Sequence, residues 1–149
     1  MNIYRVQHSL FDSTLPRIIL RILNSGNKIH LVCRNTDEMK HIDNLLWTFS
    51  KLSFIPHVTE EDNFLSELQD VIITSKLKNA DVQYINRSLV FICHEMVKNT
   101  LIQGYQSIFL IATQNMSVEK LKKYVECVIN SKKAVKIFTQ TINNTWEES

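Results

Sequence analysis

The chain has 149 residues, a formal net charge of +2 and a hydrophobic content of 44%, which predicts one globular domain over residues 1–149. A sequence pI near 8.4 is only mildly basic, so it does not indicate the strongly basic face of a dedicated nucleic-acid-binding protein. The longest apolar run, residues 108–112, is far shorter than the roughly 20 residues of a membrane-spanning helix, so no membrane association is expected.

The three cysteines, Cys33, Cys93 and Cys127, are far apart in the sequence. An odd number without close spacing argues against a disulfide framework or a zinc site and favours a reducing cytoplasm. The first residues lack the apolar core of a signal peptide, so a cytoplasmic location is expected.

The first part of the chain predicts a strand at residues 3–7, a helix, and a buried strand at residues 29–33. Gly26 stands where a left-handed C-terminal cap would end the helix. The N-cap of the helix is expected to be one of three short polar residues, Asp12, Ser13 or Thr14. His30, within the second strand, is interpreted as a hydrogen-bonded structural residue and not as a ligand.

A second helix, capped by Asn35 or Thr36, has one apolar stripe with the i, i+3, i+4, i+7 spacing. The stripe consists of Ile42, Leu45, Leu46 and Phe49. Trp47 lies about 150° from the middle of that stripe, at roughly 100° per residue. A helix with a complete inward face therefore carries a tryptophan on its other side.

Large apolar residues, Phe54, Ile55 and Pro56, follow this helix in a predicted loop. Together with Trp47 they indicate a partner-binding surface, since aromatic residues anchor protein interfaces. The alternative is that the loop folds back and Trp47 packs beneath Phe54 and Pro56 as a small satellite cluster.

The remaining elements continue the alternation of apolar strands and amphipathic helices. An acidic, irregular segment is expected at residues 59–69. Strands are predicted at residues 71–74, 82–86, 107–113 and 134–139, helices at 91–103 and from a Ser117 cap to about residue 130, and a polar tail with Trp146 at 142–149. The alternation predicts an α/β fold, a single Rossmann-like layer structure with a mostly parallel sheet and helices on both faces.

Nucleotide binding is not expected despite this fold class. The two glycines, Gly26 and Gly104, both follow predicted helices, and no glycine-rich turn follows the first strand where a pyrophosphate would approach the backbone. Cys93, His94 and Glu95 are adjacent on a predicted helix, so their side chains diverge. The sequence therefore predicts no cofactor and no metal.

Basic residues gather on the last predicted helix, at Lys120, Lys122 and Lys123, next to Tyr124. Lys122 lies at the margin of the inward stripe, and the other two lysines point further outward. Such a helix fits an acidic peptide, because lysine stems can flank an apolar slot. The alternative is a solvated, lysine-rich surface helix.

The stretch around Trp47 resembles the chi subunit of bacterial DNA polymerase III holoenzyme. Family members have an acidic residue, two leucines and a tryptophan at the end of a helix, then a Ser-Phe-aliphatic-Pro-His run. The matching residues are Asp43, Leu45, Leu46, Trp47, Phe49, Ser53, Phe54, Pro56 and His57, and the weaker likeness ends with Phe138-Thr139-Gln140 and Trp146-Glu147.

The resemblance implies a non-catalytic replication subunit with a Rossmann-like fold and two binding faces. The face at Trp47, Phe54, Ile55 and Pro56 would bind the psi subunit, and through it the clamp loader. The lysine helix with Tyr124 would bind the acidic C-terminal tail of single-stranded-DNA-binding protein. The family carries arginines where this chain has lysines, which lack the bidentate guanidinium fork.

The sequence is also compatible with two other functions. One is a small α/β enzyme with Cys93 or Cys33 as nucleophile, which would require an activated thiolate. The other is direct binding of single-stranded nucleic acid by the lysine cluster, which would show a steep salt dependence.

Overall fold

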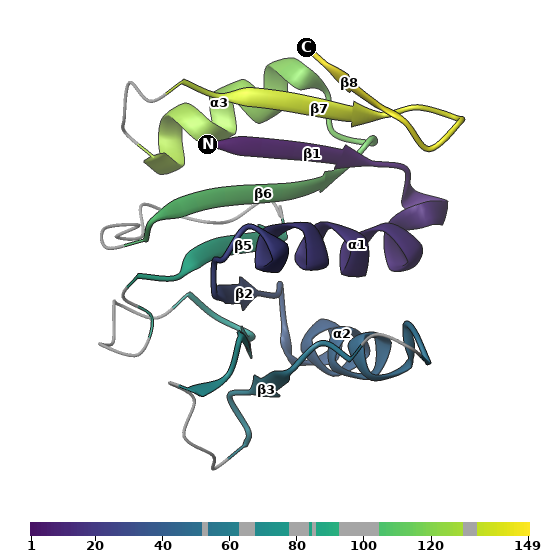
Figure 1. The fold of residues 1–149 in the computed structure, drawn as a ribbon. Helices are drawn as coiled ribbons and strands as arrows, with labels where there is room; N and C mark the ends of the chain where they lie inside the picture. The colour runs from purple at the N-terminus through teal and green to yellow at the C-terminus, as the bar shows by residue number, and fades with distance from the viewer. Residues whose placement is uncertain (52–53, 63–67, 78–83, 85, 93–104, 130–133) are drawn as a thin grey trace.

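The computed structural model describes residues 1–51, 54–62, 68–77, 84, 86–92, 105–129 and 134–149. These residues include one eight-stranded sheet with the order β3-β4-β2-β5-β6-β1-β7-β8 (Figure 1). All neighbouring strands are parallel except β7 and β8. The strands are β1 (Asn2–Val6), β2 (Ile29–Val32), β3 (His57–Thr59), β4 (Val71–Thr74), β5 (Ser88–Ile92), β6 (Ser107–Thr113), β7 (Lys136–Gln140) and β8 (Trp146–Glu148).

The helices lie on both faces of the sheet, so the predicted α/β fold is confirmed (Figure 1). They are the short 3₁₀ helix η1 (His8–Leu10), α1 (Phe11–Asn24), α2 (Thr36–Thr48) and α3 (Val118–Ile129). Adjacent side chains of β1 point to opposite faces of the sheet. Tyr4 packs in the apolar layer with α1 and α2, and Ile3 packs in the apolar layer with α3. No described helix has the length and apolar character needed to cross a membrane.

The ends of the first two helices show which cap predictions hold. Gly26 has φ +84°, and its N–H donates to the Leu23 carbonyl at 2.9 Å, as predicted. Asn35 caps α2, because its side chain accepts from the Glu38 N–H at 2.8 Å. The predicted side-chain cap of α1 is wrong: η1 runs directly into α1, and Leu10 at the N-cap makes no side-chain hydrogen bond.

The predicted helix at residues 91–103 begins in the wrong place. Phe91 and Ile92 are the last residues of β5, and they are buried in opposite apolar layers. The run from Ser88 to Ile92 is apolar and rich in strand-forming residues, which outweighs the helical spacing that starts at Ile92. Residues 93–103 lie outside the described part of the chain.

Three further predictions need correction. Of the predicted strand 82–86, residues 82, 83 and 85 lie outside the described part, and Asn86 is in a turn with φ +67°. His57–Thr59 forms β3, where a loop and an acidic segment were expected. The predicted polar tail contains β8, because Asn144 adopts φ +59° and reverses the chain so that Trp146 pairs with Gln140.

Candidate partner-binding surfaces

Trp47 and Phe54 form an exposed aromatic pair at the end of α2. Their side chains are 57% and 61% exposed, and their ring centroids are 5.2 Å apart. Ile42 and Leu46 fill the opposite side of α2 and are fully buried in the core. The predicted outward position of Trp47 is therefore confirmed, and the alternative that Phe54 and Pro56 cover it is not.

The loop before β3 separates the other predicted residues. Ile55 was predicted to be part of the surface, and this prediction is wrong. Its side chain is fully buried in the core with α1 and α2. Pro56 is half-buried, and its carbonyl accepts from the Val71 N–H at 3.2 Å. We define the Trp47 surface as Trp47, Phe54 and Pro56. Its loop is anchored by Ile55 inside the protein.

His57 lies directly beneath this surface. Its side chain is fully buried, and its ring centroid is 5.0 Å from that of Trp47. Nδ1 is 2.6 Å from the Ile55 carbonyl oxygen, and Nε2 is 3.1 Å from Oδ1 of Asp43. The ring thus connects the loop to α2.

The second predicted surface lies on α3, which begins with the predicted Ser117 cap: the Ser117 hydroxyl accepts from the Lys120 N–H at 3.3 Å. Leu121 and Val125 are buried against the sheet. Tyr124 is half-buried, with its ring 6.4 Å from that of Phe91. We define the lysine face as the exposed Lys120, Lys122 and Lys123 together with Tyr124.

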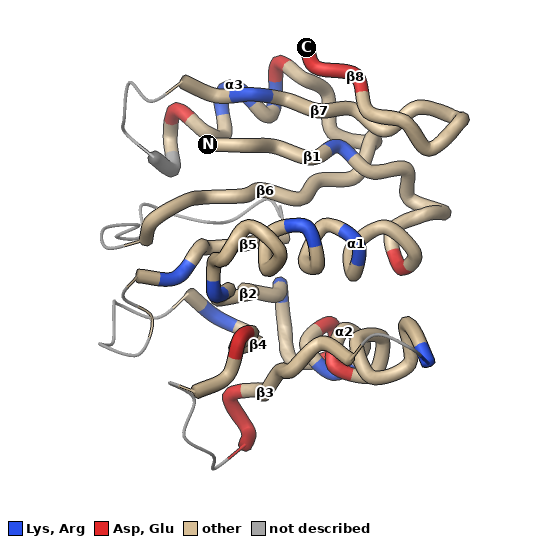
Figure 2. Tube along the Cα trace, in the orientation of Figure 1, with Lys and Arg blue, Asp and Glu red and all other residues tan. Residues whose placement is uncertain are grey.

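Other basic residues near α3 do not extend the lysine face in the described structure. Lys136, on β7, pairs with Glu148 of β8 at 3.2 Å. Lys132 and Lys133 lie outside the described residues. Figure 2 shows basic positions on α3 and also on α1, whereas acidic positions gather after β3.

Of the two thiols considered as alternative nucleophiles, Cys33 lies in the described part of the chain. Cys33 is 4% exposed, and burial, with a smaller contribution from the Glu38 carboxylate, raises the pKa of its thiol far above the usual value. A thiolate at neutral pH is therefore disfavoured at Cys33. Cys93 lies outside the described residues. Among those described, no group of three or more His, Cys, Asp or Glu side chains could hold a metal.

A hollow of about 630 Å³ lies at the carboxyl ends of β1, β2, β5 and β6, where open α/β sheets commonly bind ligands. Its rim contains the beginnings of α1 and α2. Glu38 accepts from the Arg34 N–H at 2.7 Å and pairs with its guanidinium at 2.6 Å, while Asp12 is 3.0 Å from His41. The chain's own carboxylates lie where a phosphate would bind, which disfavours a nucleotide.

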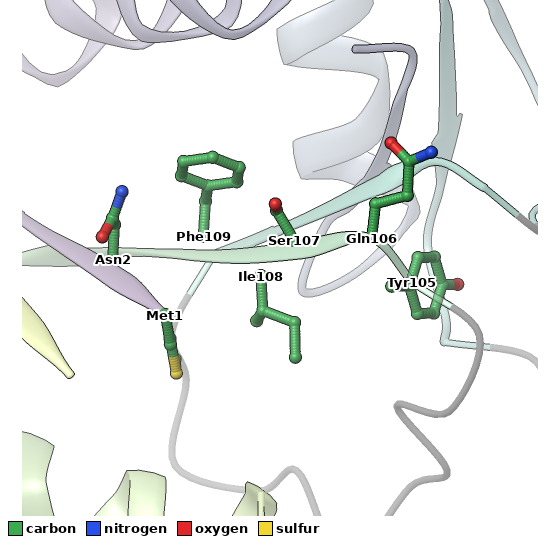
Figure 3. Close-up of a pocket in the computed structure, with 7 residues that line it drawn as sticks. All are labelled: Met1, Asn2, Tyr105, Gln106, Ser107, Ile108 and Phe109. Atoms are coloured by element: carbon green, nitrogen blue, oxygen red, sulfur yellow. The ribbon is translucent and has the colours of Figure 1, made fainter. Parts of the chain in front are cut away.

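A smaller hollow of about 210 Å³ lies at the amino ends of β1 and β6 (Figure 3). Ile108 and Phe109 point to opposite sides of their strand there. Among the described residues that line this hollow, no side chain is a carboxylate, histidine, lysine or arginine, and burial raises the pKa of Tyr105 to about 12.

The structural contacts of two polar residues, Arg87 and Asp43, were not predicted from the sequence. Arg87 is 3% exposed, and its Nη1 donates to the carbonyl oxygens of Ile29, Gln69 and Asp70 at 3.4, 2.9 and 3.3 Å. An isolated arginine before a strand carries no sequence signal of such a role. Asp43 was noted only as part of a motif, because its contact with His57 depends on the fold.

Comparison with known proteins now decides the family. Residues 2–145 match the model of the family described as "DNA polymerase III chi subunit, HolC". The chain belongs to the DNA polymerase III chi family. It is similar to the "Probable DNA polymerase III subunit chi" of Rickettsia prowazekii (strain Madrid E), with 24% identity over 155 residues that cover 99% of this chain and 90% of the relative.

Membership in the chi family confirms the resemblance found in the sequence. A chi subunit is an accessory subunit of a complex with DNA polymerase activity, and it takes part in DNA replication with protein partners in that complex. An accessory role agrees with the surfaces described above, since they offer exposed aromatic and cationic side chains.

Proposed function

We propose that this chi subunit tethers the clamp loader to single-stranded-DNA-binding protein in the cytoplasm. The Trp47 surface would bind the psi subunit of the clamp-loader assembly. The lysine face would bind the acidic C-terminal tail of single-stranded-DNA-binding protein. Nucleic acid would then be contacted only indirectly, through the coated template.

The observation that carries the proposal is the pair of unlike surfaces on the two faces of one sheet. Trp47 and Phe54 are large, more than half exposed and in contact with each other, which is typical of an interface anchor. Three exposed lysines beside the half-buried Tyr124 suit an acidic peptide that also carries an apolar group. Linking two such sites raises the effective concentration of one partner near the other.

The test is a calorimetric titration of the chain with the acidic tail peptide of its own single-stranded-DNA-binding protein. The expected result is saturable binding that weakens moderately with added salt, because burial of the terminal apolar residue is insensitive to salt. A matched peptide without that residue should bind about tenfold more weakly, as expected for the loss of roughly 1.4 kcal/mol of burial.

Two outcomes would contradict the proposal. Equal affinity for both peptides would show that no apolar pocket contributes. Complete loss of binding at modest salt, together with similar behaviour towards naked single-stranded DNA, would instead favour direct nucleic-acid binding by the lysines.

A further inference from the structure

The Trp47 surface is assembled from two chain segments that are connected beneath it by the contacts of one buried histidine, His57. Trp47 comes from α2, whereas Phe54 comes from the loop before β3. His57 lies between these segments with its side chain fully buried, and Asp43, which is 31% exposed, lies one helical turn before Trp47.

The chemistry of the two neighbours fixes the orientation of the His57 ring. The Ile55 carbonyl oxygen can only accept, so Nδ1, at 2.6 Å, donates to it. On the other side of the ring, Nε2 faces Oδ1 of Asp43 at 3.1 Å. A flip of the ring would place carbon atoms against both oxygens, so this arrangement holds the imidazole in a single orientation.

We propose that Asp43 and His57 are positioning residues that hold Trp47 and Phe54 in one arrangement before a partner binds. Asp43 fixes the His57 ring against α2, and His57 fixes the loop through the Ile55 carbonyl. The His57 ring also supports the Trp47 indole, at a centroid distance of 5.0 Å. The Trp47 and Phe54 side chains are therefore held in place in the free protein. They lose less conformational freedom on binding a partner than unsupported side chains would.

This inference rests on the proposed function only where it concerns the partner. The rigidity of Trp47 is a property of the free chain, and it can be measured without any partner. A purely structural role for His57 predicts that changes at Asp43 alter stability slightly and leave the motion of the Trp47 side chain unchanged.

The test compares Asp43→Leu, which removes the oxygen facing Nε2, with Asp43→Asn, which keeps an oxygen and adds an amide donor. Both are made in a Trp146→Phe background, so that Trp47 is the one remaining tryptophan of the two in the sequence. Asn44→Leu is the matched control, because it places the same apolar side chain at an exposed neighbouring position of α2.

Time-resolved fluorescence anisotropy of Trp47 is the first readout. Asp43→Leu should increase the amplitude of fast local motion about twofold, whereas Asp43→Asn and Asn44→Leu should match the parent. His57→Gln should resemble Asp43→Leu. Unchanged anisotropy in both Asp43→Leu and His57→Gln would overturn the proposal. Asp43 is partly exposed, so its variants are expected to fold, and circular dichroism checks this for each protein.

Binding to the clamp-loader assembly isolated from the same cells is the second readout. Asp43→Leu should weaken binding about tenfold and Asp43→Asn less than twofold, because ordering two loosened aromatic side chains opposes association. Changed anisotropy with unchanged affinity would refute the positioning role in recognition. If the parent protein itself does not bind the assembly, the proposed function of the Trp47 surface fails, while the anisotropy result still decides whether Asp43 and His57 fix Trp47.

Discussion

His30 is a fully buried histidine whose two ring nitrogens both have partners. Nδ1 is 2.7 Å from the Tyr105 hydroxyl, and Nε2 is 2.9 Å from the Thr74 hydroxyl. The ring also stacks on Tyr84, with centroids 4.0 Å apart. Burial, and secondarily the charge of Arg87, lowers the pKa of His30 to about 3. The neutral imidazole is therefore part of the folded structure, as the sequence had suggested.

The lowered pKa predicts a specific loss of stability in acid. The ordinary value is 6.5, so below this pH the unfolded chain takes up a proton that the folded chain excludes until about pH 3. The free energy of unfolding should then fall by up to about 1.4 kcal/mol per pH unit from this residue, and should be unaffected above pH 6.5. Urea unfolding between pH 7 and pH 4 measures this slope.

A His30→Gln variant serves as the comparison for that slope. It should be less stable by about 1–3 kcal/mol at pH 7, because it loses hydrogen bonds in a buried site. Its stability should nevertheless decrease less steeply between pH 6 and pH 4 than that of the parent. Parallel pH profiles for the two proteins would show that His30 does not cause the acid sensitivity.

At the scale of one element, the three lysines of α3 lie at different angles around the helix, so charge reversal at each should weaken peptide binding to a different degree. Lys122 lies nearest the inward stripe that contains Leu121 and Val125, and Lys123 lies on the opposite side. Lys122→Glu should weaken binding of the acidic tail peptide about tenfold, which corresponds to roughly 1.4 kcal/mol. Lys123→Glu is the matched control and should have a smaller effect, because exposed pairs contribute about 0–1 kcal/mol.

Calorimetry with each variant, including Lys120→Glu, establishes the order of the effects. Equal and small losses at all three positions would place the tail on another surface. A thermal-unfolding control is needed for Lys122→Glu, because the Lys122 side chain also interacts with Glu119 across one turn of the helix.

Elements with one clear apolar period could be predicted from the sequence. The stripe of α2 and the continuous apolar run of β6 define those elements before any tertiary contact is known. The strands β5 and β8 could not be predicted in this way. The end of β5 also fits a helical period, and β8 becomes a strand only because β7 offers a free edge and Tyr4 offers an edge-on contact to Trp146 at 5.2 Å.

The candidate site shows the same division between local and spatial information. The outward position of Trp47 follows from the angular spacing along its own helix, so it could be predicted. Phe54 is exposed and Ile55 is buried because of the way the loop packs on the core, and the spacing of apolar residues in the sequence does not define this packing. The contact of His57 with Asp43 joins residues from different elements, and no motif specifies its geometry.

At the scale of the whole molecule, the two proposed surfaces lie on opposite faces of the sheet. α2 packs beside β3 and β4, whereas α3 packs on the layer that includes Ile3 of β1 and Ile137 of β7 (Figure 1). Along the sheet, β3 is the outer strand on the α2 side, and β5, whose Phe91 lies beside Tyr124, is separated from it by β4 and β2. Neither partner would cover the other's surface.

This separation predicts that the two partners bind together and independently. Saturating the lysine face with tail peptide should change the affinity of the Trp47 surface for the clamp-loader assembly by less than about twofold, because distant sites without shared contacts are additive within roughly 0.5 kcal/mol. Biolayer interferometry with and without peptide measures this. Competition between the two ligands would contradict separate surfaces, and a large mutual enhancement would indicate allosteric coupling.

The place of β1 in the sheet has a consequence for how the chain is made. β1 is the first strand in the sequence, yet both of its neighbours, β6 and β7, come from the last third of the chain. On the ribosome, β1 has no native neighbour until β6 (residues 107–113) has emerged, and its second neighbour, β7, follows only at residue 140. The apolar Ile3, Tyr4 and Val6 therefore lack native strand partners through most of synthesis. A chain that stops before β6 lacks both native neighbours of its first strand, so we expect truncated chains to be recognised by chaperones and proteases.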